Sequence, residues 1–143
     1  MVDTDEQTTI EQSYYLIENE QVFSQSQLWE MQRHYYESMG VEAWRRGEVP
    51  HYVTSNLRIA NSYAEMAFAF WRDRQRIAPV DEPLVICELG AGSGRFAFHF
   101  LSRLSRLCAE AHVPMTAFRY VMTDLAPSNL AFFRAHPRFG PYF

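Results

Sequence analysis

The chain has 143 residues, 48% hydrophobic and 21% charged, which is enough for one sizeable core and argues against a disordered chain. No run approaches the roughly 20 apolar residues of a membrane span, and the N-terminus is acidic where a targeting peptide would be basic, so we expect a cytoplasmic protein with no membrane contact. The formal net charge is −4 and the 13 basic residues are arginines scattered along the chain, so we expect no nucleic-acid partner.

Two helices are predicted near the N-terminus. Residues 10–17 carry apolar side chains at helical spacing and predict a short first helix. The Ser-Gln-Ser-Gln run at residues 24–27 predicts a capping box, after which apolar residues line one face of a helix over residues 28–39. We expect this second helix to end at Gly40 or Gly47, because glycine commonly terminates helices.

An extended stretch and a third helix follow. Residues 48–53 contain a proline and no helical period, which predicts extended chain. A helix that begins at residue 57 has a wide apolar stripe through residue 71, polar capping residues before it, and three arginines at residues 72, 74 and 76 in its last turns. Two prolines then mark a boundary, so we divide the chain into a helical N-terminal region, residues 1–80, and a second region, residues 81–143.

The second region alternates strands and helices. Residues 84–89 form a short, continuous apolar run, which is typical of a strand buried on both faces of a parallel sheet. Residues 95–111 keep strict i, i+3, i+4 apolar spacing, which predicts a helix. Residues 118–123 are predicted to form a second strand, and residues 128–136 a further helix. This order predicts an α/β fold whose helical region precedes the first βαβ unit of a Rossmann-like sheet.

A glycine-rich turn, Glu-Leu-Gly-Ala-Gly-Ser-Gly at residues 88–94, lies between the first strand and its helix. Glycine permits positive φ and close approach of a ligand, and the edge at which parallel strands end is where ligands bind in open α/β sheets. A dinucleotide fingerprint would want a small residue where this chain has Arg95, and a phosphate-binding P-loop requires a lysine, which the chain lacks. With the dinucleotide fingerprint disfavoured and the P-loop excluded, the pattern that is left is a GxGxG turn preceded by Glu88.

This turn resembles motif I of the class I S-adenosylmethionine (SAM) methyltransferases, in which an acidic residue, one further position and GxGxG follow the first strand. The resemblance implies SAM as the cofactor, with the glycines making room for it and Glu88 facing its methionine amino group. Asp124, after the second strand, matches the family's second acidic position and would accept hydrogen bonds from both ribose hydroxyls. The cofactor-binding residues implied are Glu88, Gly90, Ala91, Gly92, Gly94 and Asp124.

A second resemblance covers more of the chain. The His-Tyr-Val-Thr-Ser segment at residues 51–55, a helix and then the glycine turn are similar to the layout of the MidA-like methyltransferases, in which an aromatic residue, one position and Thr-Ser help to enclose the cofactor. This resemblance implies Tyr52 and Thr54 as further cofactor contacts and a protein arginine as the methyl acceptor. The chain departs from the family at Pro50-His51, where the family has Gly-Asp, and at Asn56-Leu57, where it has Pro-Glu.

Catalytic residues are not assigned. The family fold has seven strands and this sequence predicts two, so we expect the sheet to be truncated and the catalytic and acceptor-binding residues to lie outside this chain. Cys87 and Cys108 have no CxxC partner and no nearby histidine pair, so we expect both to be buried and no metal to be bound.

Two alternatives remain open. One is a noncatalytic, truncated SAM-binding or helical interaction module, which would associate with itself through exposed sheet edges. The other is a nucleotide-binding oxidoreductase that tolerates the missing third fingerprint glycine.

Overall fold

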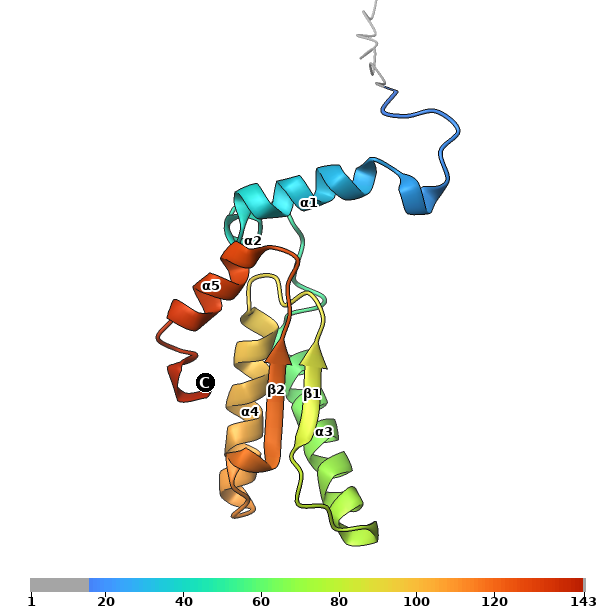
Figure 1. Ribbon diagram of the computed structural model, residues 1–143. Helices are drawn as coiled ribbons and strands as arrows, with labels where there is room; N and C mark the ends of the chain where they lie inside the picture. The colour runs from blue at the N-terminus through green and yellow to red at the C-terminus, as the bar shows by residue number, and fades with distance from the viewer. Residues whose placement is uncertain (1–15, 143) are drawn as a thin grey trace, which may run out of the picture.

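The computed structural model describes residues 16–142, in which five α-helices and three short 3-10 helices accompany one two-stranded parallel sheet (Figure 1). In chain order the elements are η1 (Phe23–Gln25), α1 (Leu28–Met39), α2 (Glu42–Arg45), α3 (Leu57–Ile77), β1 (Leu84–Glu88), α4 (Arg95–Glu110), η2 (Met115–Ala117), β2 (Phe118–Met122), α5 (Pro127–Ala135) and η3 (Gly140–Tyr142). The mixed α/β class is therefore confirmed. The helix predicted over residues 10–17 lies outside the described residues except for its last two, which are not helical.

The start of α1 differs from the predicted capping box. No side chain caps this helix from Gln27, the residue before it. Instead the Ser26 hydroxyl accepts the Leu28 N–H at 3.2 Å, and the Glu18 carboxylate accepts the Gln27 N–H at 2.8 Å. The helix ends at Gly40, as predicted, with φ of 51°. The stretch expected to be extended, residues 48–53, is not regular: residues 48 and 49 form a bend, and residues 52 and 53 belong to a turn over residues 52–54 that precedes α3.

The third predicted helix is confirmed as α3. The Asn56 side chain caps it by accepting the Ile59 N–H at 2.9 Å. Ala60 and Ala64 are fully buried, so their small side chains let α4 pack closely against α3. An exposed ion pair also links the two helices, with both Arg103 Nε and Nη2 donating to Glu65 Oε1.

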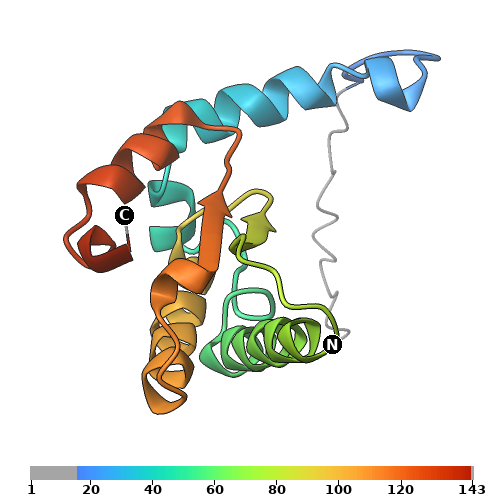
Figure 2. The same ribbon diagram turned by 60° about the horizontal axis from the view of Figure 1, so that its bottom comes forward.

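The two strands run parallel, with the register Leu84↔Phe118 through Glu88↔Met122. Both α3 and α4 lie on the same side of the sheet (Figures 1 and 2), and the core forms between that face and the helices. The opposite face carries Val85, which is 56% exposed, and Val121, which is 37% exposed.

The prediction that the first strand is buried on both faces is therefore wrong. No element among residues 16–142 packs over the second face of the sheet. The side chains of β1 are therefore covered on one face only, although residues 84–87 of the strand are all apolar. Cys87 is exposed on this open face for the same reason, whereas Cys108 is buried in α4 as predicted. Within the same residues, no helix combines the length and apolarity needed to cross a bilayer.

Candidate functional site

The glycine turn connects β1 to α4 at the edge where both strands end. Gly90, Gly92 and Gly94 all have positive φ, at 71°, 57° and 72°. A Cβ on Gly92 would lie 2.8 Å from the Trp44 ring, and one on Gly94 would lie 2.9 Å from the Phe133 ring. No atom of residues 16–142 lies within 4 Å of the same position on Gly90. Packing therefore requires the last two glycines, while Gly90 faces open space.

The end of β2 holds this turn in place. Thr123 N–H donates to the Glu88 carbonyl at 3.0 Å, and the Thr123 carbonyl accepts the Ala91 N–H at 2.8 Å. One residue further on, Asp124 Oδ2 accepts the Gly92 N–H at 2.7 Å. These bonds fix the backbone of the turn relative to the sheet, so a ligand above Gly90 would meet a preformed surface.

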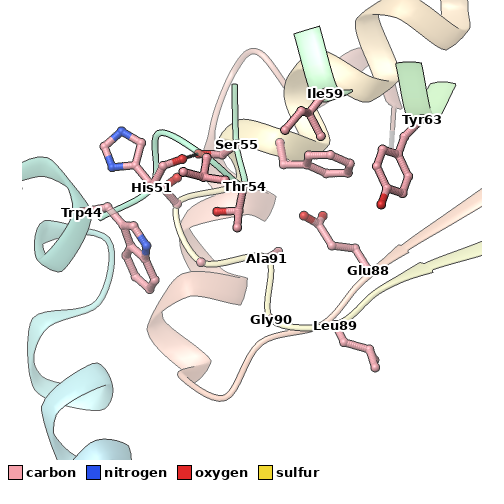
Figure 3. A pocket seen from close by; sticks show the side chains of 14 residues that line it. Trp44, His51, Thr54, Ser55, Ile59, Tyr63, Glu88, Leu89, Gly90 and Ala91 are labelled. Atoms are coloured by element: carbon pink, nitrogen blue, oxygen red, sulfur yellow. Dashed lines mark hydrogen bonds between the residues drawn. The ribbon is translucent and has the colours of Figure 1, made fainter. Parts of the chain in front are cut away.

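A pocket of about 590 Å³ opens above the turn (Figure 3). This volume falls within the range of roughly 300–1,000 Å³ that is usual for small-molecule sites. Its walls come from the turn, from the segment before α3 and from the first turns of α3 and α4. The lining residues are Trp44, His51, residues 53–55, Ile59, Tyr63, residues 88–93 and Phe96.

Glu88 projects from the end of β1 into this pocket, toward α3 (Figure 3). Burial raises the pKa of its carboxyl, the hydrogen bond donated by Tyr120 Oη at 3.0 Å opposes that rise, and the charge of Asp124 adds to it. Among the residues from 16 to 142 that line the pocket, Glu88 is the one with a carboxyl group, and none is an arginine or a lysine. The ionised pocket is therefore negative and has aromatic walls, which suits a ligand carrying positive charge.

Glu88→Gln is expected to stabilise the empty protein at neutral pH by about 1 kcal/mol, a common size for a single substitution. Because the pKa of Glu88 is raised from its ordinary value of 4.5, the folded state binds more protons than the unfolded state between the two pKa values. The unfolding free energy of the wild type therefore falls as pH rises from 4.5 through the raised pKa of the folded state, and this fall disappears in the variant. Urea denaturation across this pH range measures both effects.

The matched control is Glu82→Gln, which removes an exposed carboxylate in the loop before β1. Its stability at neutral pH should lie within about 0.5 kcal/mol of that of the wild type. A Glu88→Gln protein that is less stable at neutral pH than the wild type would show that the ionised carboxylate stabilises the fold.

The segment before α3 brings part of the second resemblance to the pocket. Thr54 and Ser55 line it, and the Ser55 hydroxyl donates to the His51 carbonyl at 2.7 Å. His51 Nε2 accepts from Arg95 Nη1 at 3.3 Å, and its buried Nδ1 has no partner within residues 16–142. Tyr52 does not line the pocket; it is 73% exposed and stacks on the His51 ring at 4.8 Å.

Asp124 lies outside this pocket and already has three partners. Besides Gly92, its carboxylate accepts the Ala126 N–H and the Asn129 side-chain amide, each at 2.9 Å. A carboxylate has about four acceptor positions, so about one is left for a ligand. Accepting two ribose hydroxyls, as the sequence led us to expect, would require a partner within the protein to give way. Asp124 lines a neighbouring pocket of about 270 Å³.

Several lining residues have no counterpart in the sequence prediction. Ile59 and Tyr63 lie four positions apart in α3, and Phe96 lies in the first turn of α4, so their helical spacing could have placed them near the turn. Trp44 has no such signal, because its position depends on how α2 folds back toward the turn. No group of three or more His, Cys, Asp or Glu side chains within the described part of the chain could hold a metal ion.

Comparisons with known proteins do not identify a family. No protein-family model, no curated protein and no solved structure matches the chain. The geometry of the site is thus the basis for a functional conclusion.

Proposed function

We propose that the pocket above Gly90 binds SAM and that the chain is the N-terminal cofactor-binding portion of a SAM-dependent methyltransferase with a Rossmann-like sheet. The observation that carries the proposal is the opening at Gly90, with Glu88 in the same pocket. SAM has a sulfonium and an ammonium group, and both are attracted to a carboxylate and to aromatic faces. A protein side chain is the acceptor class that we put forward for testing.

The charge of the pocket favours SAM over a dinucleotide. The pyrophosphate of NAD or FAD carries negative charge and would lie close to the Glu88 carboxylate at the same turn. Arg95, the residue that replaces the third fingerprint glycine, is exposed and directed toward His51, outside the pocket lining. The oxidoreductase alternative therefore has the weaker physical support.

The contribution of the chain to methyl transfer would be binding and orientation. When bound, SAM supplies an electrophilic methyl group on its sulfonium sulfur. Glu88 would hold the ammonium group, the glycine turn would set the depth of the ligand, and Tyr63 and Phe96 would exclude water from one side. No residue within 16–142 is assigned as a base for the acceptor. A noncatalytic SAM-binding module would have the same site, and a methyl-transfer assay separates the two.

The proposal is tested by thermal denaturation of the chain with SAM, its demethylated product S-adenosylhomocysteine, and NAD. A ligand at roughly 100 times its Kd stabilises the folded state by about 2.7 kcal/mol, which corresponds to a rise in Tm of roughly 5–10 °C for a chain of this size. We expect this rise with SAM and with the product, and no rise with NAD. A rise with NAD alone, or with none of the three, would refute the proposal.

A further inference from the structure

A further pocket, of about 210 Å³, lies where α4 begins, between this helix and the chain that follows α5. We call it the basic pocket, because its lining includes Arg45 from α2, Arg95 at the start of α4, and His136 and Arg138 after α5. Among residues 16–142, none that lines it is an aspartate or a glutamate. The whole chain has a formal net charge of −4, so this pocket is a local concentration of positive charge in an acidic protein.

The three guanidinium groups of the basic pocket keep most of their donors for a ligand. Arg138 makes no ion pair and no side-chain hydrogen bond within residues 16–142. Arg95 has no carboxylate partner in the same part of the chain, and only its Nη1 is engaged, by His51 Nε2 at 3.3 Å. Arg45 donates through Nη1 to the Glu42 carboxylate at 2.8 Å. A guanidinium carries several N–H groups in a planar fork, so each of the three can still donate to an anion.

Aromatic rings hold two of these guanidinium groups at the pocket. Arg45 Cζ lies 5.7 Å from the centroid of the Phe132 ring, and Arg138 Cζ lies 5.6 Å from that of Phe98. At these distances a cation is attracted to the face of the ring. Both rings are half-buried and line the pocket themselves. The two arginines are therefore partly ordered before a ligand arrives, which lowers the entropic cost of binding.

His136 adds a hydrogen-bond donor to the pocket. Its Nδ1 accepts the Arg138 backbone N–H at 3.3 Å, so the neutral imidazole carries its proton on Nε2. Within residues 16–142, Nε2 has no hydrogen-bond partner and can donate to a ligand. The first turn of α4 contains no acidic residue, so the positive end of the helix dipole adds to the field of the side chains.

We infer that the basic pocket binds a phosphate group, carried either by a small molecule or by a phosphorylated protein side chain. Such a group has a charge of about −1.5 to −2 at pH 7 and several acceptor oxygens, which match guanidinium forks. The pocket is smaller than the roughly 300–1,000 Å³ of a usual small-molecule site, which suits one phosphate group rather than a nucleotide. Within residues 16–142 it shares only Ser93 with the Glu88 pocket, so the inference does not depend on SAM.

The test titrates the full chain by calorimetry with inorganic phosphate, with a short peptide carrying one phosphoserine, and with the unphosphorylated peptide. Sodium chloride keeps the ionic strength constant and screens long-range attraction. We expect phosphate and the phosphopeptide to bind and to shift the backbone amide NMR signals of Ser93, Arg95 and Arg138, and the unphosphorylated peptide not to bind. Tighter binding of the phosphopeptide than of phosphate would identify a protein side chain as the source, and equal affinity would identify a small molecule.

Arg138→Gln should weaken phosphate binding about tenfold or more, because it removes charge-assisted hydrogen bonds. Arg138 is exposed in a turn after α5, so the variant should fold. The matched control is Arg106→Gln, which removes the same charge from an exposed position of α4 outside the pocket and should bind phosphate as the wild type does. The inference is overturned if the wild type binds neither phosphate nor the phosphopeptide, or if the two variants bind phosphate equally well. Because no SAM is present, failure of the proposed function would leave these results unchanged.

Discussion

Gly90→Ala is expected to weaken SAM binding by about 10- to 100-fold, because a methyl group placed in occupied space costs about 1–3 kcal/mol. Gly90 lines both the Glu88 pocket and the neighbouring Asp124 pocket, and its Cβ would point into the open space above the turn. The empty protein has room for this methyl group, whereas a bound ligand would occupy the same space and clash with it. The positive φ of 71° adds a cost of about 1–2 kcal/mol to folding itself. Calorimetric titration measures the affinity, and urea denaturation measures the stability.

Gly47→Ala is the matched control for this experiment. Gly47 also has a positive φ, at 76°, and no atom of the described residues lies within 4 Å of its Cβ position, yet it lines neither of these two pockets. The two variants should therefore lose similar stability and differ in affinity. Equal affinities for SAM in Gly90→Ala and Gly47→Ala would contradict the placement of the ligand over Gly90.

Phe133→Ala is expected to destabilise the protein by about 3–5 kcal/mol, the usual range for loss of a buried phenylalanine. Phe133 in α5 is 2% exposed, and its ring packs against Gly94 and the ring of Phe139. Removing it leaves a cavity directly behind the glycine turn. The midpoint of urea denaturation should fall accordingly, since about 3–5 kcal/mol is a large part of the stability of an ordinary domain.

Phe70→Ala serves as the comparison, because Phe70 is 61% exposed on α3. A surface substitution of this kind usually changes stability by no more than about 0.5 kcal/mol. If the two phenylalanine variants were equally stable, α5 would not be packed against the turn as described.

The sequence predicted the elements whose pattern is local. The apolar spacing over residues 95–111 identified α4 to within one residue, and the run at residues 84–89 identified β1 in the same way. The turn between them was recognised because three glycines in alternation have few explanations other than tight backbone geometry. The structure adds that only Gly90 is left open, since the other two positions are filled by neighbouring rings.

Features that depend on distant packing were not predictable in this way. Whether a strand is covered on one face or on both is decided by the other elements that pack against it. The sequence therefore predicted the strand β1 correctly but predicted burial for Val85 and Cys87, which are exposed. The approach of Trp44 to Gly92 joins residues nearly fifty positions apart, and no sequence period reports it. The hydrogen bond from the Gly92 N–H to Asp124 likewise joins residues 32 positions apart and arises only once the glycine turn meets the end of β2, whereas the bonds from Ala126 and Asn129 to Asp124 are local.

The open face and edges of the sheet bear on association. Val85 and Val121 leave apolar surface on the face opposite α3 and α4. Strand edges with unpaired backbone groups tend to pair with further chains. Self-association through these edges stays a prediction, and sedimentation of the purified chain over a range of concentrations would measure it.

The most direct test of the central claim is a crystal structure of the chain grown with S-adenosylhomocysteine. The account predicts that the ligand lies across Gly90, with its amino group at hydrogen-bond distance from the Glu88 carboxylate. A ligand bound elsewhere, or bound with its amino acid portion away from Glu88, would contradict the assignment of this pocket.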